Sequence, residues 1–323
     1  MSLLLTGATG FLGRNVLLRS VSEGREVFAP VRSPGKLIQQ LRFEKRDLHG
    51  VHALPTSPDK WPAIAPRSAI LGGGVLFGRN RTEYFRTNVE WTLATLRALP
   101  ADCRTVVISS QAAGGPTPPG KASRSEADSD TPITWYGESK LAMEEAIRRE
   151  FPNRPITILR PPMILGPRDA ATLPLFRMAR GRVRIKPGLR TKSYSFVAVE
   201  DLVTALFLAL ENGPLTQACY VASMQPVTDW QLIAAASAAC GARGLTVPVP
   251  HFLVRILSRI VDTIPALRTQ APSLTRDRAR DIWADRWVVD GSNFEQLTGW
   301  RASMALDEAL QAAHGYYVRE GKL

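Results

Sequence analysis

The sequence predicts an α/β protein built on a doubly wound parallel sheet. Through the first half of the 323-residue chain, short apolar runs alternate with segments of helical periodicity. A glycine-rich turn joins the first apolar run to the first helical segment, and the hydrophobic content of 45% suits one large domain or two coupled ones. Because strands that alternate with helices pair in parallel, we expect helices on both faces of the sheet.

The expected elements follow from local pattern. The strands are predicted at Leu3–Thr6, Glu26–Val31, Ala69–Leu71, Arg104–Ser109 and Ile156–Leu159. Helices are predicted at Phe11–Ser22, Thr82–Leu99 and Tyr136–Glu150. The segment from Gly114 to Asp130 is rich in Pro, Gly, Ser and Asp, which predicts a loop leading into the third helix.

Composition restricts the class of protein. Three widely spaced cysteines favour small buried residues over disulfides, and four histidines without ligand spacing predict no metal site. No signal peptide and no apolar run of membrane-spanning length is found, so we expect a cytoplasmic protein without a membrane span. The net charge is +12, but no nucleic-acid motif accompanies it, so we expect no nucleic-acid partner. The basic run Arg177–Lys192 is interpreted as a solvated loop or as an electrostatic funnel for an anionic substrate.

The stretch "TGATGFLGR" contains Gly7, Gly10 and Gly13 directly after a strand and at the start of a helix. Glycine lets the backbone turn tightly and approach a pyrophosphate, while the helix N-terminus offers N–H groups and a positive dipole. The pattern predicts a Rossmann-type dinucleotide site. Its contacts are expected from Gly7, Thr9, Gly10, Phe11, Leu12 and Gly13. A glycine-rich turn without a ligand is the alternative.

The end of the second strand indicates which dinucleotide binds. NAD sites place an acid there to hold the ribose 2′-hydroxyl, whereas this chain has Arg32 and Ser33, with Lys36 close by. Arginine pairs with a 2′-phosphate, which an acid would repel. We therefore expect NADP, with NAD as the alternative; an ordinary surface role for Arg32 is the competing interpretation.

The pattern changes after Pro161, where prolines and basic residues become frequent. We expect residues 1–162 to form the dinucleotide-binding domain, with residues 193–224 returning to it. Residues 163–192 and 225–323 would form a smaller, mixed α/β substrate-binding region. Apolar residues from Phe252 to Ile264 have helical spacing, which favours packing against this region; a lid over an apolar substrate and a membrane-surface helix are the alternatives.

Seven short motifs occur in an order that resembles the extended short-chain dehydrogenase/reductase family. They are "TGATGFLG", "RDL", "YFRTNVEWT", "VVISSQAAGGP", "WYGESKLAMEE", "ILRPPMILGPRD" and "SFVAVEDL". The family comprises NAD(P)-dependent epimerases, dehydratases and hydroxysteroid-dehydrogenase-like reductases. The resemblance spans nearly the whole chain and implies a homodimer formed through helices that flank the sheet.

The resemblance implies a role for each matching residue. Tyr136 matches the catalytic tyrosine, Lys140 its lysine partner and Ser110 the catalytic serine, with Ser109 as the neighbouring alternative. Four residues separate Tyr136 from Lys140, which puts both on one helix face. A phenol needs a nearby cation to act as a base near neutral pH, and Lys140 is expected to supply it. Cofactor contacts are implied for Asp47, Leu48, Gly73, Asn88, Ser109, Tyr136, Lys140, Pro161 and Pro162.

Departures from the family pattern indicate which reaction and which class of substrate to expect. Tyr194 stands where sugar-nucleotide enzymes of the family carry a diphosphate-binding arginine, although Arg190 and Lys192 are candidates to replace it. No Asp-Glu pair follows Ser110, unlike in the dehydratase branch. We therefore expect an NADP(H)-dependent oxidoreductase that transfers a hydride between nicotinamide and a carbonyl or secondary alcohol of a fairly hydrophobic small molecule. The alternatives are an NAD-dependent sugar-nucleotide epimerase and a non-catalytic dinucleotide sensor.

Overall fold

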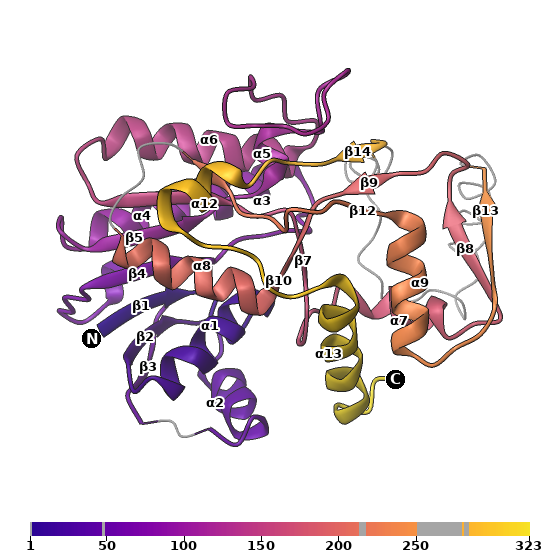
Figure 1. Cartoon of the computed structure of the whole chain (residues 1–323). Coiled ribbons are helices and arrows are strands. Elements are labelled where there is room, and N and C mark those ends of the chain that lie inside the picture. Colours follow the sequence, from indigo (N-terminus) through magenta and orange to yellow (C-terminus); the bar gives the residue numbers. More distant parts are fainter. Residues whose placement is uncertain (1, 47–48, 213–217, 251–279, 281–283) are drawn as a thin grey trace.

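The computed structural model describes residues 2–46, 49–212, 218–250, 280 and 284–323. Its centre is a seven-stranded parallel sheet in the order β11-β6-β5-β4-β1-β2-β3 (Figure 1). The strands are β1 (Ser2–Thr6), β2 (Glu26–Pro30), β3 (Val51–Leu54), β4 (Ser68–Leu71), β5 (Arg104–Ile108), β6 (Ile156–Arg160) and β11 (Cys219–Tyr220). The predicted doubly wound parallel sheet is confirmed.

Helices cover both faces of the sheet (Figure 1). One face packs against α1 (Phe11–Ser22), α2 (Pro34–Phe43) and α8 (Val199–Glu211), and the other against α4 (Trp91–Ala98) and α6 (Trp135–Glu150). The central strands are buried on both sides, which explains why their sequences are continuous apolar runs rather than alternating ones. Leu3, Leu4 and Leu5 of β1 are fully buried.

The expected helix Thr82–Leu99 is interrupted. It consists of α3 (Arg81–Phe85), the π-helical turn η2 (Arg86–Glu90) and α4. A π-turn adds a residue to the helical repeat and changes which side chains face inward. Here Asn88 is fully buried within the turn, so the interruption places a polar side chain at the end of the sheet.

The smaller region lies beyond the carboxyl end of the sheet and contains three short sheets (Figure 1). They pair β7 (Met163–Leu165) with β10 (Phe196–Ala198), β9 (Ser193–Tyr194) with β12 (Val227–Thr228) and β14 (Arg286–Trp287), and β8 (Val183–Pro187) with β13 (Leu245–Val249). The helices α7 (Leu173–Ala179), α9 (Asp229–Ala239) and α13 (Leu306–Arg319) share a separate apolar core. The short helices η1 (Pro58–Lys60), α5 (Gln111–Gly114) and α12 (Ser292–Thr298) complete the described elements.

The strand order determines where a ligand would bind. From β1 the chain builds outward through β2 and β3, then crosses back to place β4 on the other side of β1. In open parallel sheets, ligands bind outside the carboxyl ends of the strands at such a reversal. The candidate site is therefore expected at the ends of β1, β4 and β5. Within the described residues, no helix is long and apolar enough to cross a bilayer.

Candidate active site

The glycine loop between β1 and α1 is shaped for a phosphate group. Gly7 has φ of +74°, and a Cβ there would lie 2.9 Å from the Gly72 carbonyl oxygen. A Cβ on Gly13 would lie 2.1 Å from the Gly7 carbonyl oxygen, so α1 approaches the loop as closely as glycine allows. No side chain caps the N-terminus of α1, and its first turn carries no acid. These features fit the pyrophosphate of a dinucleotide.

The remaining loop residues complete this cradle. Thr9, Phe11 and Leu12 are partly exposed and Gly10 is exposed. The Gly10 N–H donates to the Gly7 carbonyl at 2.8 Å, which closes the turn, and Gln40 of α2 donates to the Thr9 carbonyl at 3.2 Å. The loop is thus held by one hydrogen bond of its own backbone and one from the Gln40 side chain.

The end of β2 is positively charged. Arg32 and Lys36 are both exposed, and Ser33 caps α2 by accepting a hydrogen bond from the Lys36 N–H. The first turn of α2 contains no acid. The predicted Asp47 and Leu48 contacts lie outside the described residues.

The loop after β4 is fixed by Trp91 and Asn88. The Gly73 N–H donates to Thr6 Oγ1 at 2.9 Å, and a Cβ on Gly73 would lie 2.4 Å from the Trp91 ring. Asn88 accepts from the Val75 N–H at 2.8 Å and donates to Ser139 Oγ at 2.9 Å. The structure thus places Asn88 as a brace between this loop and α6, whereas the resemblance implied a cofactor contact. The Asn88 prediction stays untested.

Ser110 and Tyr136 come from segments that touch each other. Ser110 follows β5 and is the N-cap of α5, and Tyr136 lies in the first turn of α6, which Thr134 caps. A Cβ on Gly137 would lie only 2.3 Å from the Ala112 carbonyl oxygen, so the residue after Tyr136 packs against the turn after Ser110. Tyr136 is partly exposed, and its ring centre lies 6.2 Å from that of Tyr84.

Lys140 lies one turn further along α6 and is 6% exposed. Its Nζ donates to the Ile108 carbonyl, at the end of β5, at 2.8 Å. Burial lowers the pKa of Lys140 to about 8, and the nearby Glu144 carboxylate opposes this shift. The ammonium is therefore held in a fixed place beside the ends of β4 and β5. A Cβ on Gly74 would lie 3.6 Å from Nζ.

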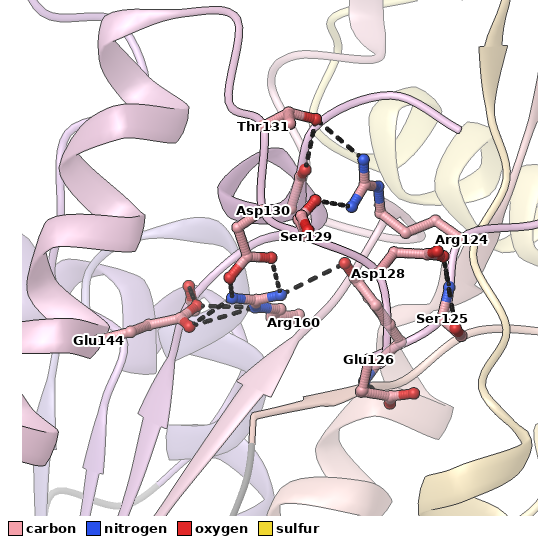
Figure 2. Close-up of polar contacts among 12 residues, drawn as sticks. Arg124, Ser125, Glu126, Asp128, Ser129, Asp130, Thr131, Glu144 and Arg160 are labelled. Atoms are coloured by element: carbon pink, nitrogen blue, oxygen red, sulfur yellow. Dashed lines mark hydrogen bonds and ion pairs between the residues drawn. The ribbon is translucent and has the colours of Figure 1, made fainter. Parts of the chain in front are cut away.

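A buried network that the sequence did not reveal joins β6, α6 and the loop before α6 (Figure 2). Arg160, at the end of β6, donates to Glu144 of α6 at 2.7 Å and to both carboxylate oxygens of Asp130 at 2.7 Å. The side chains of Arg160 and Glu144 are 4% and 0% exposed. These two carboxylates raise the pKa of Arg160 above its ordinary value, against the opposing effect of burial. The network ties the loop before α6 to the sheet.

Ser109 belongs to this network. Its hydroxyl donates to Glu144 at 2.5 Å, and the residue is 2% exposed. The partly exposed Ser110 is therefore better placed for a substrate than Ser109. Pro161 and Pro162 are buried directly after β6, where the Pro161 carbonyl accepts from the Gln111 N–H at 3.0 Å. They border the Ser110 turn.

The basic run Arg177–Lys192 is not one loop, and only part of it is solvated: four of its cations are exposed, namely Arg177, Arg180, Arg182 and Arg190. It contains the end of α7 and all of β8, and Arg184, Lys186 and Lys192 are at most 6% exposed. Arg184 and Lys186 bind carbonyl groups and a carboxylate of the protein, so they do not line a funnel. The helical pattern between Phe252 and Ile264 lies outside the described residues.

A glycine-rich strand–turn–helix unit at the reversal of a parallel sheet defines a dinucleotide-binding α/β enzyme. The family model described as "NAD dependent epimerase/dehydratase family" matches residues 3–221. The chain belongs to this family and is an NAD(P)-dependent oxidoreductase with a nicotinamide cofactor. The predicted family and enzyme class are thereby confirmed.

Curated relatives agree with this assignment, and solved structures share the fold. The ceramide reductase of Caulobacter vibrioides is 25% identical over 288 residues, which cover 88% of this chain and 84% of the relative. The sterol demethylase protein B of Methylococcus capsulatus is 28% identical over 229 residues, covering 66% and 67%. The UDP-glucose 4-epimerase of Thermotoga maritima has the same fold, with a TM-score of 0.76, 18% identity and 99% of each chain covered.

Proposed function

We propose that this protein is an NADP(H)-dependent reductase or dehydrogenase that acts on a carbonyl or secondary alcohol of a fairly hydrophobic small molecule. Three observations support the proposal. Ser110 directly follows β5, the turn after it packs against the first turn of α6, which carries Tyr136, and the Lys140 Nζ donates to the Ile108 carbonyl at the end of β5. A proton donor, a hydroxyl and a buried ammonium are the groups that carbonyl reduction requires.

In the proposed reduction, a bound nicotinamide would supply the hydride for the carbonyl carbon. The Tyr136 hydroxyl donates its proton to the carbonyl oxygen, and Ser110 donates a hydrogen bond to the same oxygen as it gains negative charge. Lys140 stabilises the phenolate that Tyr136 leaves, because an ammonium one helical turn away favours the anionic form. Alcohol oxidation uses the same groups in reverse.

Two observations support a hydrophobic substrate over a sugar nucleotide. By their names, the two relatives that match 88% and 66% of this chain act on a ceramide and a sterol, both of which are lipids, whereas a relative named for a dTDP sugar matches only 44% of it. Of the two cations that are candidates to bind a diphosphate, Lys192 is poorly placed for it because it is only 2% exposed, whereas Arg190 is exposed and pairs with the Asp285 carboxylate at 3.4 Å. Tyr194, which replaces the family's arginine, has a pKa raised to about 12 by burial and stays neutral.

The preference for NADP is proposed to depend on Arg32. We expect Arg32→Ala to raise the dissociation constant of NADPH roughly 10- to 100-fold, because a hydrogen-bonded charge pair contributes about 1.5–3 kcal/mol. The dissociation constant of NADH should stay within about threefold, since NADH has no 2′-phosphate for Arg32 to bind. Titration of both nucleotides by intrinsic fluorescence measures these constants.

Arg42→Ala is the matched control, because Arg42 is an exposed arginine in the last turn of the same helix, α2. It should leave both constants unchanged. Equal losses of NADPH and NADH affinity in Arg32→Ala would indicate damage to the loop instead. Unchanged NADPH binding in that variant would contradict the assignment of Arg32.

A further inference from the structure

The two-stranded sheet of β8 and β13 exposes its aliphatic side. Its strands pair in parallel, with Leu245 opposite Val183, Val247 opposite Ile185 and Val249 opposite Pro187. Since side chains alternate along a strand, these six apolar residues share one face. Val183, Ile185 and Leu245 are 65%, 42% and 67% exposed. We call residues 183–187 and 245–249 the β8–β13 ribbon; Figure 1 shows it at the edge of the molecule farthest from the large sheet.

The opposite face of the ribbon is charged and buried. Arg184 donates to the Ala179 and Ala242 carbonyls at 3.0 and 2.9 Å. Lys186 is fully buried and lies 2.8 Å from the Asp229 carboxylate. If the aliphatic face turned inward, both cations would lose these partners. Buried polar groups left unpaired reduce the stability of the fold, so this orientation is unfavourable. The ribbon is thus fixed with its apolar side toward the outside, an arrangement typical of an interaction surface.

Exposed arginines lie close to the ends of the two strands. Arg182 and Arg243 come just before β8 and β13, and Arg180 and Arg190 flank the same strands; all four are exposed. Residues 170–192 and 230–250 contain no Asp or Glu, and Asp285 pairs with Arg190 at 3.4 Å, which leaves Arg180, Arg182 and Arg243 as the main source of positive charge. The surface therefore combines projecting aliphatic side chains with a positive rim.

We propose that the β8–β13 ribbon docks the protein on an anionic lipid bilayer. Aliphatic side chains enter the boundary between headgroups and acyl chains, while arginines reach the lipid phosphates. A two-fold contact between copies of this chain would set like-charged rims against each other, which disfavours a second copy as the occupant. This inference does not depend on the proposed reaction.

Co-sedimentation of the full chain with vesicles tests this proposal. We expect binding to phosphatidylcholine vesicles that contain phosphatidylglycerol, much weaker binding to pure phosphatidylcholine, and loss of binding in high salt. The Arg182→Gln/Arg243→Gln variant should bind anionic vesicles about 30-fold more weakly, since each arginine near such a surface contributes about 1 kcal/mol. The Val183→Ser/Ile185→Ser variant should also lose binding.

Matched controls come from other surfaces. Arg42→Gln removes an exposed arginine of α2, and Leu297→Ser removes a 52% exposed leucine of α12. Both should bind like the unaltered chain. The dissociation constant of NADPH should be the same in every variant, which would show that each variant is folded. The Arg182→Gln/Arg243→Gln variant changes residues just outside the ribbon, so it tests the proposal even if the Val183→Ser/Ile185→Ser variant does not fold. Absence of binding, equal binding to neutral vesicles, or a dimer that the ribbon substitutions dissociate would each overturn the proposal.

Discussion

Tyr136→Phe should lower kcat by roughly 100- to 10,000-fold, the usual contribution of a positioned general acid. The substitution removes only the phenolic oxygen, so the first turn of α6 and its close contact with the Ala112 carbonyl should remain. Cofactor affinity should therefore stay nearly unchanged. Steady-state kinetics with a reducible ketone, together with NADPH titration, separates the two effects.

Tyr84→Phe provides a control beside Tyr136. The two rings lie 6.2 Å apart, and the Tyr84 hydroxyl donates to the Leu76 carbonyl at 3.2 Å. Removing that hydroxyl should cost about 1 kcal/mol of stability. It should leave kcat within about threefold, because Tyr84 has no part in the proposed proton transfer. A kcat of Tyr136→Phe within tenfold of that of the unaltered enzyme would contradict the mechanism.

Arg160→Met should lower the free energy of unfolding by about 3–5 kcal/mol. The substitution keeps much of the side-chain volume but leaves the Glu144 carboxylate, which is fully buried, without its main cation. An uncompensated buried charge is far more costly than a lost surface ion pair. Urea unfolding followed by circular dichroism measures the difference.

Arg148→Met is the comparison, because Arg148 pairs with the same carboxylate from an exposed position. Its guanidinium lies 3.2 Å from Glu144, and its side chain is 44% exposed. Exposed pairs contribute only about 0–1 kcal/mol, so this variant should unfold nearly like the unaltered chain. Equal losses in the two variants would show that the buried pair is not the stabilising one.

The elements that could be predicted are those whose sequence signals lie close together in the chain. Helix α1 has the predicted bounds Phe11–Ser22 because the glycine turn before it and its apolar spacing are both local. Strand β11 was not predicted because it has only two residues, and β3 was not predicted because, unlike the equally short β4, it has exposed residues in its middle and no apolar run. Their places are set by pairing with the sheet rather than by their own pattern.

The local sequence could not show which charged side chains are buried, because their partners come from distant segments. Lys186 and Asp229 lie 43 residues apart, and Arg160 meets Glu144 and Asp130 only after the sheet and α6 have packed. A charged residue in a short basic run is usually solvated, so local sequence favours the wrong interpretation. For Glu144 one local signal existed, because it follows Lys140 by one helical turn on the face that carries Tyr136.

The central claim is a net transfer of hydride to or from a hydrophobic carbonyl compound. It is tested most directly by incubating the protein with NADPH and a panel of lipid-like ketones, and comparing nucleotide oxidised with alcohol formed. We predict one NADPH oxidised for each alcohol molecule produced. Turnover of a nucleotide sugar without net change in the nicotinamide would contradict the proposal and indicate an epimerase. Binding of NADPH without turnover of any substrate would contradict it too, and indicate a dinucleotide sensor.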